Sequence, residues 1–139
     1  MPISRDDLFL GKWVLDPEFA EYEVGQPPRS GTYLIEAADE QLRFTIDWVA
    51  ADGGQHHLVI LATPDGHEYP YDDPQVADAI IYTRIDEYTL DSATKKDGAI
   101  TNYTRRMVNP AGDLMQIEQS GALPDGSAFT NRSLYRKQS

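Results

Sequence analysis

Apolar and polar residues alternate along most of the chain. The clearest case is QLRFTIDWV, residues 41–49, in which the apolar side chains occupy every second position. A period of two places successive side chains on opposite faces of an extended strand, so one face of this segment is expected to be buried. Similar patterns predict strands at residues 11–16, 32–37, 56–63, 79–85, 88–94, 99–108, 114–122 and 127–137, with a short additional strand around 68–71.

Turn signals separate these segments at intervals of about ten residues, as is typical of an antiparallel barrel or sandwich. They are rich in Asp and Gly, which tolerate the positive φ of tight turns, and lie at residues 52–54, 65–66, 97–98, 109–112 and 124–126. Helix signals are few, since residues 4–8 and 17–21 would each make only a single turn.

These patterns predict an all-β fold with one domain over residues 1–139, in which residues 1–8 form an N-terminal extension. We expect a single antiparallel up-and-down β-barrel of about eight to ten strands, because closing the sheet removes its edges. A sandwich of two sheets is the alternative architecture.

Composition narrows the possible functions. The chain has no cysteine, which excludes disulfides, thiol nucleophiles and Cys-based metal sites. It carries 12 Lys and Arg against 23 Asp and Glu, a net charge of −11, which opposes binding to nucleic acid or to an anionic membrane. Without a signal-peptide or transmembrane pattern, the protein is expected to be soluble, cytoplasmic, and a monomer or homodimer.

Several short motifs resemble a known group of barrels. They are the opening GKW at residues 11–13, GQPP at 25–28, DGHEYP at 65–70 and the closing LYRK at 134–137. Together they resemble the lipocalin and fatty-acid-binding-protein superfamily (calycins), and more closely a group of bacterial lipocalin-like proteins of unknown function. The resemblance implies a barrel whose central cavity holds a small apolar ligand.

The sequence also departs from that resemblance. Fatty-acid-binding proteins close with Arg-x-Tyr, whose inward side chains grip a carboxylate, but if Tyr135 is that tyrosine then Ser133 stands at the arginine position. Strand alternation would place Arg132 and Arg136 on the other face. Residues 17–30 are also too short for the helical lid of that family, so a more open mouth is expected.

Alternation predicts which side chains face the interior. Trp13 is expected inside as a core plug at the closed end of the barrel. In residues 99–108, Tyr103 and Arg105 are expected on the inner face together with Met115 of the next strand. Arg105 would then be a buried cation, which is costly unless it is paired or meets an anionic ligand. A register displaced by one residue would turn Arg106 inward instead.

These residues predict the binding of a small hydrophobic ligand whose polar or anionic end meets Tyr103, Arg105 and Tyr135. The candidate ligand-binding residues are Tyr103, Arg105, Tyr135, Trp48, Phe44 and Met115. The alternatives are a cavity enzyme of isomerase or hydratase type acting by acid/base catalysis, and a filled barrel that serves as an interaction or structural module. A binding protein is favoured over an enzyme.

No catalytic residue, metal site or cofactor is predicted. The chain has no nucleophile elbow and no Gly-rich phosphate loop before a helix. Adjacent His56 and His57 point to opposite faces of a strand, and no helical His motif exists for zinc or haem, although a single axial histidine stays open. The acidic run at residues 65–74 is expected to be a rim loop whose tyrosines pack across the barrel opening.

Overall fold

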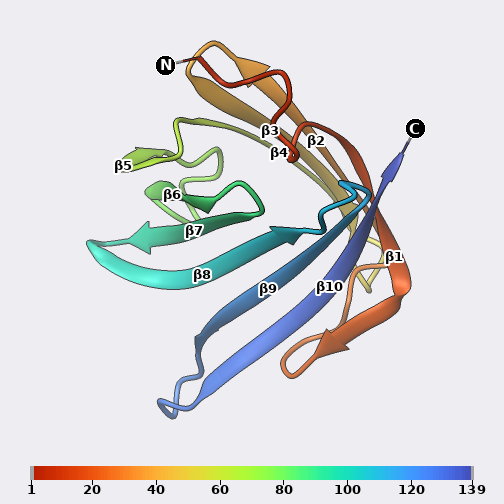
Figure 1. Cartoon of the computed structure of the whole chain (residues 1–139). Coiled ribbons are helices and arrows are strands. Elements are labelled where there is room, and N and C mark those ends of the chain that lie inside the picture. The colour runs from red at the N-terminus through yellow and green to blue at the C-terminus, as the bar shows by residue number, and fades with distance from the viewer. Residues whose placement is uncertain (1, 139) are drawn as a thin grey trace.

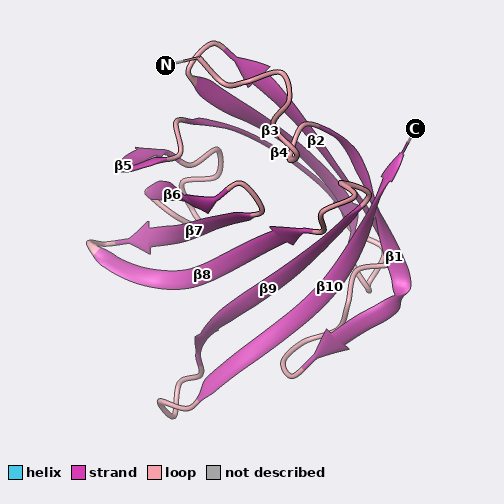
Figure 2. Cartoon of the chain, viewed as in Figure 1, coloured by secondary structure: helices cyan, strands magenta, loops and turns pink. Residues whose placement is uncertain are grey.

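The structure is a computed structural model that describes residues 2–138, and it contains ten strands and no helix in that range (Figure 2). The strands are β1 (Gly11–Tyr22), β2 (Ser30–Ala38), β3 (Gln41–Val49), β4 (Gln55–Ala62), β5 (Asp65–Pro70), β6 (Ala79–Asp86), β7 (Thr89–Lys96), β8 (Ala99–Val108), β9 (Leu114–Ala122) and β10 (Ala128–Gln138). The predicted all-β fold is confirmed. In the part of the chain that the structure describes, no helix has the length and apolar character needed to cross a bilayer.

All ten strands belong to one sheet that curls into a nearly closed barrel (Figure 1). Its order is β4-β3-β2-β1-β10-β9-β8-β7-β6-β5. Strands that follow one another in the sequence are therefore paired, except β4 and β5, and β1 also pairs with β10. Each pairing is antiparallel. In the pair of β2 and β3, for example, Ser30 stands opposite Val49. The up-and-down barrel is therefore confirmed over the two-sheet sandwich.

The seam of the barrel lies between β4 and β5, the two ends of the strand order. No ladder of backbone hydrogen bonds joins these two strands within residues 2–138. The segment after β5 partly covers the exposed edge, because the Asp72 carboxylate accepts a hydrogen bond of 3.0 Å from the backbone N–H of Val59 in β4. A side chain thus replaces one missing strand-to-strand bond.

Two segments predicted as helical turns differ in outcome. Residues 4–8 do form a turn, in which the Asp7 N–H donates to the Ser4 carbonyl over 3.1 Å. The predicted turn at residues 17–21 is wrong, since this segment continues β1. Its pairing with β10 is interrupted between Asp16 and Glu21, so Pro17, which has no N–H to donate, falls where no ladder bond is required.

The core fills the barrel end where β1 begins. Phe9 and Trp13 are both fully buried there, and the Trp13 indole donates from Nε1 to the Phe9 carbonyl over 3.0 Å. The side chains from the surrounding strands that are also completely inaccessible include Leu42, Phe44, Leu90 and Met115. The predicted role of Trp13 as a core plug is confirmed, and burying such an aromatic group stabilises the fold by several kcal/mol, roughly 3 or more.

The opposite end of the barrel is wider. β8 and β9 pair only from Val108 opposite Met115 to Tyr103 opposite Ser120, although both strands run further. Beyond that point β9 continues with β10 while β8 continues with β7, and the two pairs spread apart in Figure 1. The barrel therefore has a packed end near Trp13, called here the closed end, and an open end.

Candidate functional site

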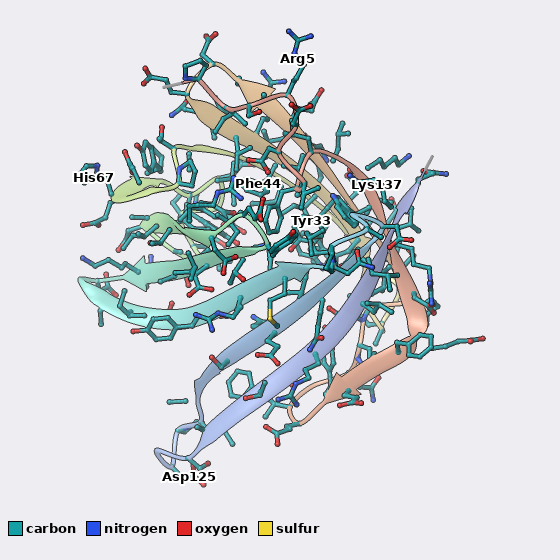
Figure 3. All side chains as sticks on the ribbon, in the orientation of Figure 1. Arg5, Tyr33, Phe44, His67, Asp125 and Lys137 are labelled. Atoms are coloured by element: carbon teal, nitrogen blue, oxygen red, sulfur yellow. The ribbon has the colours of Figure 1, made fainter. Side chains whose placement is uncertain are left out.

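A cavity of about 390 Å³ occupies the interior between the Trp13 core and the open end. Strands β2, β3, β4, β6, β7, β8, β9 and β10 line it, together with Tyr22 at the end of β1 and Tyr71 after β5. In Figure 3, Tyr33 and Phe44 lie inside the barrel, whereas His67 and Asp125 project from its periphery. The interior is thus hollow in its open half.

Arg106 of β8 projects into this cavity and is only 4% exposed. Its guanidinium donates through one terminal nitrogen to the Ser92 hydroxyl over 3.0 Å. The guanidinium carbon lies 5.4 Å from the ring centre of Tyr82 and 5.8 Å from those of Tyr33 and Phe44. Three aromatic rings therefore lie within 6 Å of the cation, the range in which such rings stabilise a desolvated positive charge.

The charge of Arg106 has no opposite partner in the cavity. Among the described residues that line the space, it is the one charged side chain, and none is Asp or Glu. Its Nε is buried without a hydrogen-bond partner. Burial by itself lowers the pKa of Arg106, but the neighbouring phenols of Tyr82 and Tyr33 outweigh that effect and the net direction is upward. The guanidinium is therefore a permanent buried cation.

Two buried tyrosines stand beside this cation. Tyr82 is fully buried and stacks on Phe44, with ring centres 4.5 Å apart, and its hydroxyl has no hydrogen-bond partner. Tyr135 meets Tyr33 edge to face at 5.1 Å. Burial raises the pKa of both Tyr82 and Tyr135, so both phenols stay protonated and can donate to an acceptor in the cavity.

The wall formed by β3, β4 and β6 is apolar. It consists of Ile46, Trp48, Leu58, Ile60 and Ile80. The Trp48 indole stacks on the exposed ring of His56, its partner in β4, with centres 5.0 Å apart, which holds the indole at the rim of the cavity. At the mouth, burial raises the pKa of Tyr71 and of Tyr22, so these phenols are also neutral.

Several predicted candidates do lie in or beside the cavity. Tyr135 and Trp48 line it, as the alternation in their strands predicts. Phe44 lies beneath Arg106 in the core, and Met115 is fully buried in the same core without lining the space. Their contact with a ligand stays a prediction.

The predicted orientation of Tyr103 and Arg105 is wrong. Tyr103 is 57% exposed on the outside of the barrel. Arg105 is also outside, where its Nε and a terminal nitrogen each donate to the Asp91 carboxylate over 2.8 Å. The alternative register, in which Arg106 faces inward, is the one observed.

The error on β8 has a physical cause. The outer face of this strand carries Ile100, Tyr103 and Met107, whereas its inner face carries mostly polar residues because it lines a cavity. Hydrophobicity therefore pointed to the wrong face. The signal that identifies the correct face is charge pairing, because Arg105 stands opposite Asp91 on one neighbouring strand and Glu118 on the other.

The end of the chain agrees with the expected departure from fatty-acid-binding proteins. Ser133 and Tyr135 face inward and are nearly buried. Arg132 and Arg136 lie outside, paired with Glu118 at 3.0 Å and Asp16 at 2.8 Å. Residues 17–30 contain no helical lid. The cavity cation is therefore supplied by β8 and not by the last strand.

The histidines lie outside the cavity lining, and Tyr71 is the one residue of the acidic segment 65–74 that belongs to it. Over residues 2–138, no group of three or more His, Cys, Asp or Glu side chains is placed to hold a metal ion. His57 pairs with Asp47 on the outer face of β3 and β4. The short strand expected around residues 68–71 is present as β5 over residues 65–70, so this part of the acidic segment is not a loop, and the tyrosine that lines the barrel opening is Tyr71.

Comparison with known proteins places the fold. No protein-family model matches the sequence, and no curated protein sequence is significantly similar to it. The chain is similar in structure to apo lipid binding protein 8 of Caenorhabditis elegans, with a TM-score of 0.67, 12% identity, and coverage of 98% of this chain and 99% of that one. It is also similar to zebrafish ileal bile acid-binding protein in complex with cholic acid, with a TM-score of 0.60, 13% identity, and coverage of 94% and 99%. This chain therefore has the barrel fold of these lipid-binding proteins, as its motifs suggested.

Proposed function

We propose that this protein binds a small amphipathic molecule in the cavity, with an anionic end against Arg106 and an apolar body against β3, β4 and β6. The observation that carries this proposal is the buried guanidinium of Arg106, whose Nε has no partner. No carboxylate stands among the described residues around it. A buried cation of this kind is costly to the folded protein unless an anion reaches it.

A carboxylate or a similar oxyanion satisfies this arrangement. A guanidinium presents several N–H donors in a planar fork that matches two oxygens of such a group. Tyr82 and Tyr135 also line the cavity, and burial keeps the pKa values of their hydroxyls above the ordinary one, so both can donate to such a group. The Ser92 hydroxyl takes one terminal N–H of Arg106, and the Nε–H remains without a partner.

The apolar wall supplies the rest of the affinity. Binding would remove Ile46, Leu58, Ile60 and the Trp48 indole from water together with the body of the ligand. The cavity volume of about 390 Å³ lies in the lower part of the range of roughly 300–1,000 Å³ typical of small-molecule sites. The names of the structural neighbours, a lipid binding protein and a bile acid-binding protein, support the same class of ligand.

The test uses dansylundecanoic acid, a fluorescent carboxylate, and its uncharged methyl ester. The acid is expected to bind saturably and to quench Trp48 by energy transfer. Arg106→Met is expected to weaken binding of the acid by roughly tenfold to a hundredfold, the size of one charge-assisted hydrogen bond, with little effect on the ester. Fluorescence titration measures all four affinities.

Arg105→Met is the matched control, because it makes the same change one residue away on the outer face of the same strand. It is expected to bind the acid like the unchanged protein. Equal weakening in the two variants, or no saturable binding of the acid to the folded protein, would overturn the proposal.

A further inference from the structure

The cavity has two chemically different walls. The wall formed by β7, β8 and β9 carries uncharged polar side chains, which are Ser92, Thr94, Asn102, Thr104 and Gln119. The opposite wall is the apolar one on β3 and β4. Because β3 stands five places from β8 in the strand order, and β4 five places from β9, these strands face each other across the ten-stranded barrel.

The strand register arranges the polar side chains in rows. Ser92, Thr104 and Gln119 stand opposite one another on three adjacent strands and form one row. Asn102 and Thr94 form the next row toward the open end. Consecutive rows are two residues apart, roughly 7 Å along a strand, and Arg106 belongs to the row on the closed-end side of Thr104. A polar stripe therefore runs from the cation to the mouth.

The stripe contains unused hydrogen-bonding capacity. The Asn102 Oδ1 atom is buried and has no partner within the described chain. The Ser92 hydroxyl accepts a hydrogen bond from the Arg106 guanidinium, which therefore reaches toward the row of Ser92 and Thr104. Because Ser92 acts here as an acceptor, its own hydroxyl proton can still be donated to another group. A plain hydrocarbon chain lying against these groups would remove them from water without replacing their hydrogen bonds, which is costly.

From this arrangement, and resting on the proposed function above, we infer that the preferred ligand is an oxygenated amphipathic anion. Its hydrocarbon body carries one or more hydroxyl or carbonyl groups along the side that faces β7, β8 and β9. Thr104 determines this specificity, because it stands at the centre of the row next to Arg106. The opposite side of the ligand is unsubstituted and lies against Ile46 and Leu58.

The experiment compares dodecanoate with a series of dodecanoates that each carry one hydroxyl at a different chain position, by isothermal titration calorimetry. The unchanged protein is expected to bind the best hydroxylated member roughly tenfold more tightly than dodecanoate, the effect of about one hydrogen bond in a closed site. Thr104→Val keeps the shape of the side chain and removes its hydroxyl. It is expected to abolish most of this preference while changing dodecanoate affinity by less than about twofold.

Thr45→Val is the control, since Thr45 is a threonine on the outer side of β3 and the substitution is the same. It is expected to keep the preference. If Thr104→Val does not fold, Gln119→Leu in the same row gives the second test with the same expected loss.

The outcomes separate the two proposals. Tight binding of dodecanoate without any preference for a hydroxylated member overturns the oxygenated ligand and leaves the proposed function in place. A preference that survives in both Thr104→Val and Gln119→Leu also overturns it. Failure of every member of the series to bind overturns both.

Discussion

The two ends of this barrel are built from the same ten strands but satisfy their buried polar groups differently. At the closed end, the buried indole N–H of Trp13 is satisfied by the Phe9 carbonyl over 3.0 Å. In the open half, the cavity is bordered by three buried side-chain atoms without a partner, on Tyr82, Asn102 and Arg106. These three are the unpartnered buried side-chain atoms of the described chain.

This contrast separates stability from binding. A buried polar group without a partner costs free energy, about 1–3 kcal/mol for a neutral one. Such groups persist only in a fold that is stabilised elsewhere, and here the fully buried side chains around Trp13 supply that stabilisation. The closed end therefore tolerates little change, whereas change at the cavity is expected to alter binding more than folding.

The largest expected effect comes from truncating the two tryptophans in turn. Trp13→Ala removes a fully buried indole from the closed end and is expected to lower the free energy of unfolding by about 3–5 kcal/mol. Trp48→Ala removes a partly exposed indole from the cavity rim and is expected to cost only about 1–2 kcal/mol. Chemical denaturation followed by circular dichroism measures both values. Similar costs for the two variants would contradict the division between the ends.

A smaller effect, of opposite sign, is expected at the cation. Arg106→Met replaces a buried charge with an apolar side chain of similar length, so the ligand-free protein is expected to become more stable by about 1 kcal/mol. Arg105→Met, which removes only the exposed pair with Asp91, should change stability little. Thermal unfolding of both variants without ligand provides the measurement. Destabilisation by Arg106→Met would show that Arg106 is a structural group rather than one held for a ligand.

The same contrast explains how much could be predicted from the sequence. At the closed end and in β3, alternation is backed by strongly apolar side chains, so the inward positions of Trp13, Phe44 and Trp48 follow from the pattern. On β8 the inner face is polar because it borders the cavity, and the pattern therefore favours the wrong face. Arg106 becomes identifiable only once the neighbouring strands are known, because Asp91 and Glu118 then mark Arg105 as the outer residue.

The local sequence also predicts the wrong structure for residues 17–21 in the second half of β1. Pro17 at the start of PEFAE is typical of a first helical turn. The structure extends it instead, since tertiary pairing resumes at Glu21 and Tyr22 opposite Arg132 and Asn131 of β10. Pairing with a strand more than a hundred residues away overrides a weak local preference, and no property of the short segment reports that partner.

The smallest effect expected is on the acid sensitivity of the open end. Asp78 precedes β6 and accepts from the Asp97 N–H over 2.6 Å, at the turn between β7 and β8, and Lys96 lies beside it. The hydrogen bond from Asp97, with a contribution from Lys96, lowers the pKa of Asp78 below its ordinary value of 3.8. A lowered pKa in the folded state means that the contribution is present above about pH 3.8 and is lost as the pH falls through the folded value. Amide hydrogen exchange at Asp97 should therefore be protected at neutral pH and accelerate, relative to its intrinsic rate, as the pH falls below 3.8, while the Trp13 amide in the apolar closed end keeps its protection. Asp78→Asn should reduce this pH dependence, because the amide keeps an acceptor oxygen but carries no charge to lose.

Equal loss of protection at Asp97 and Trp13 on acidification would mean that the barrel unfolds as one unit, and that the two ends differ in chemistry but not in local stability.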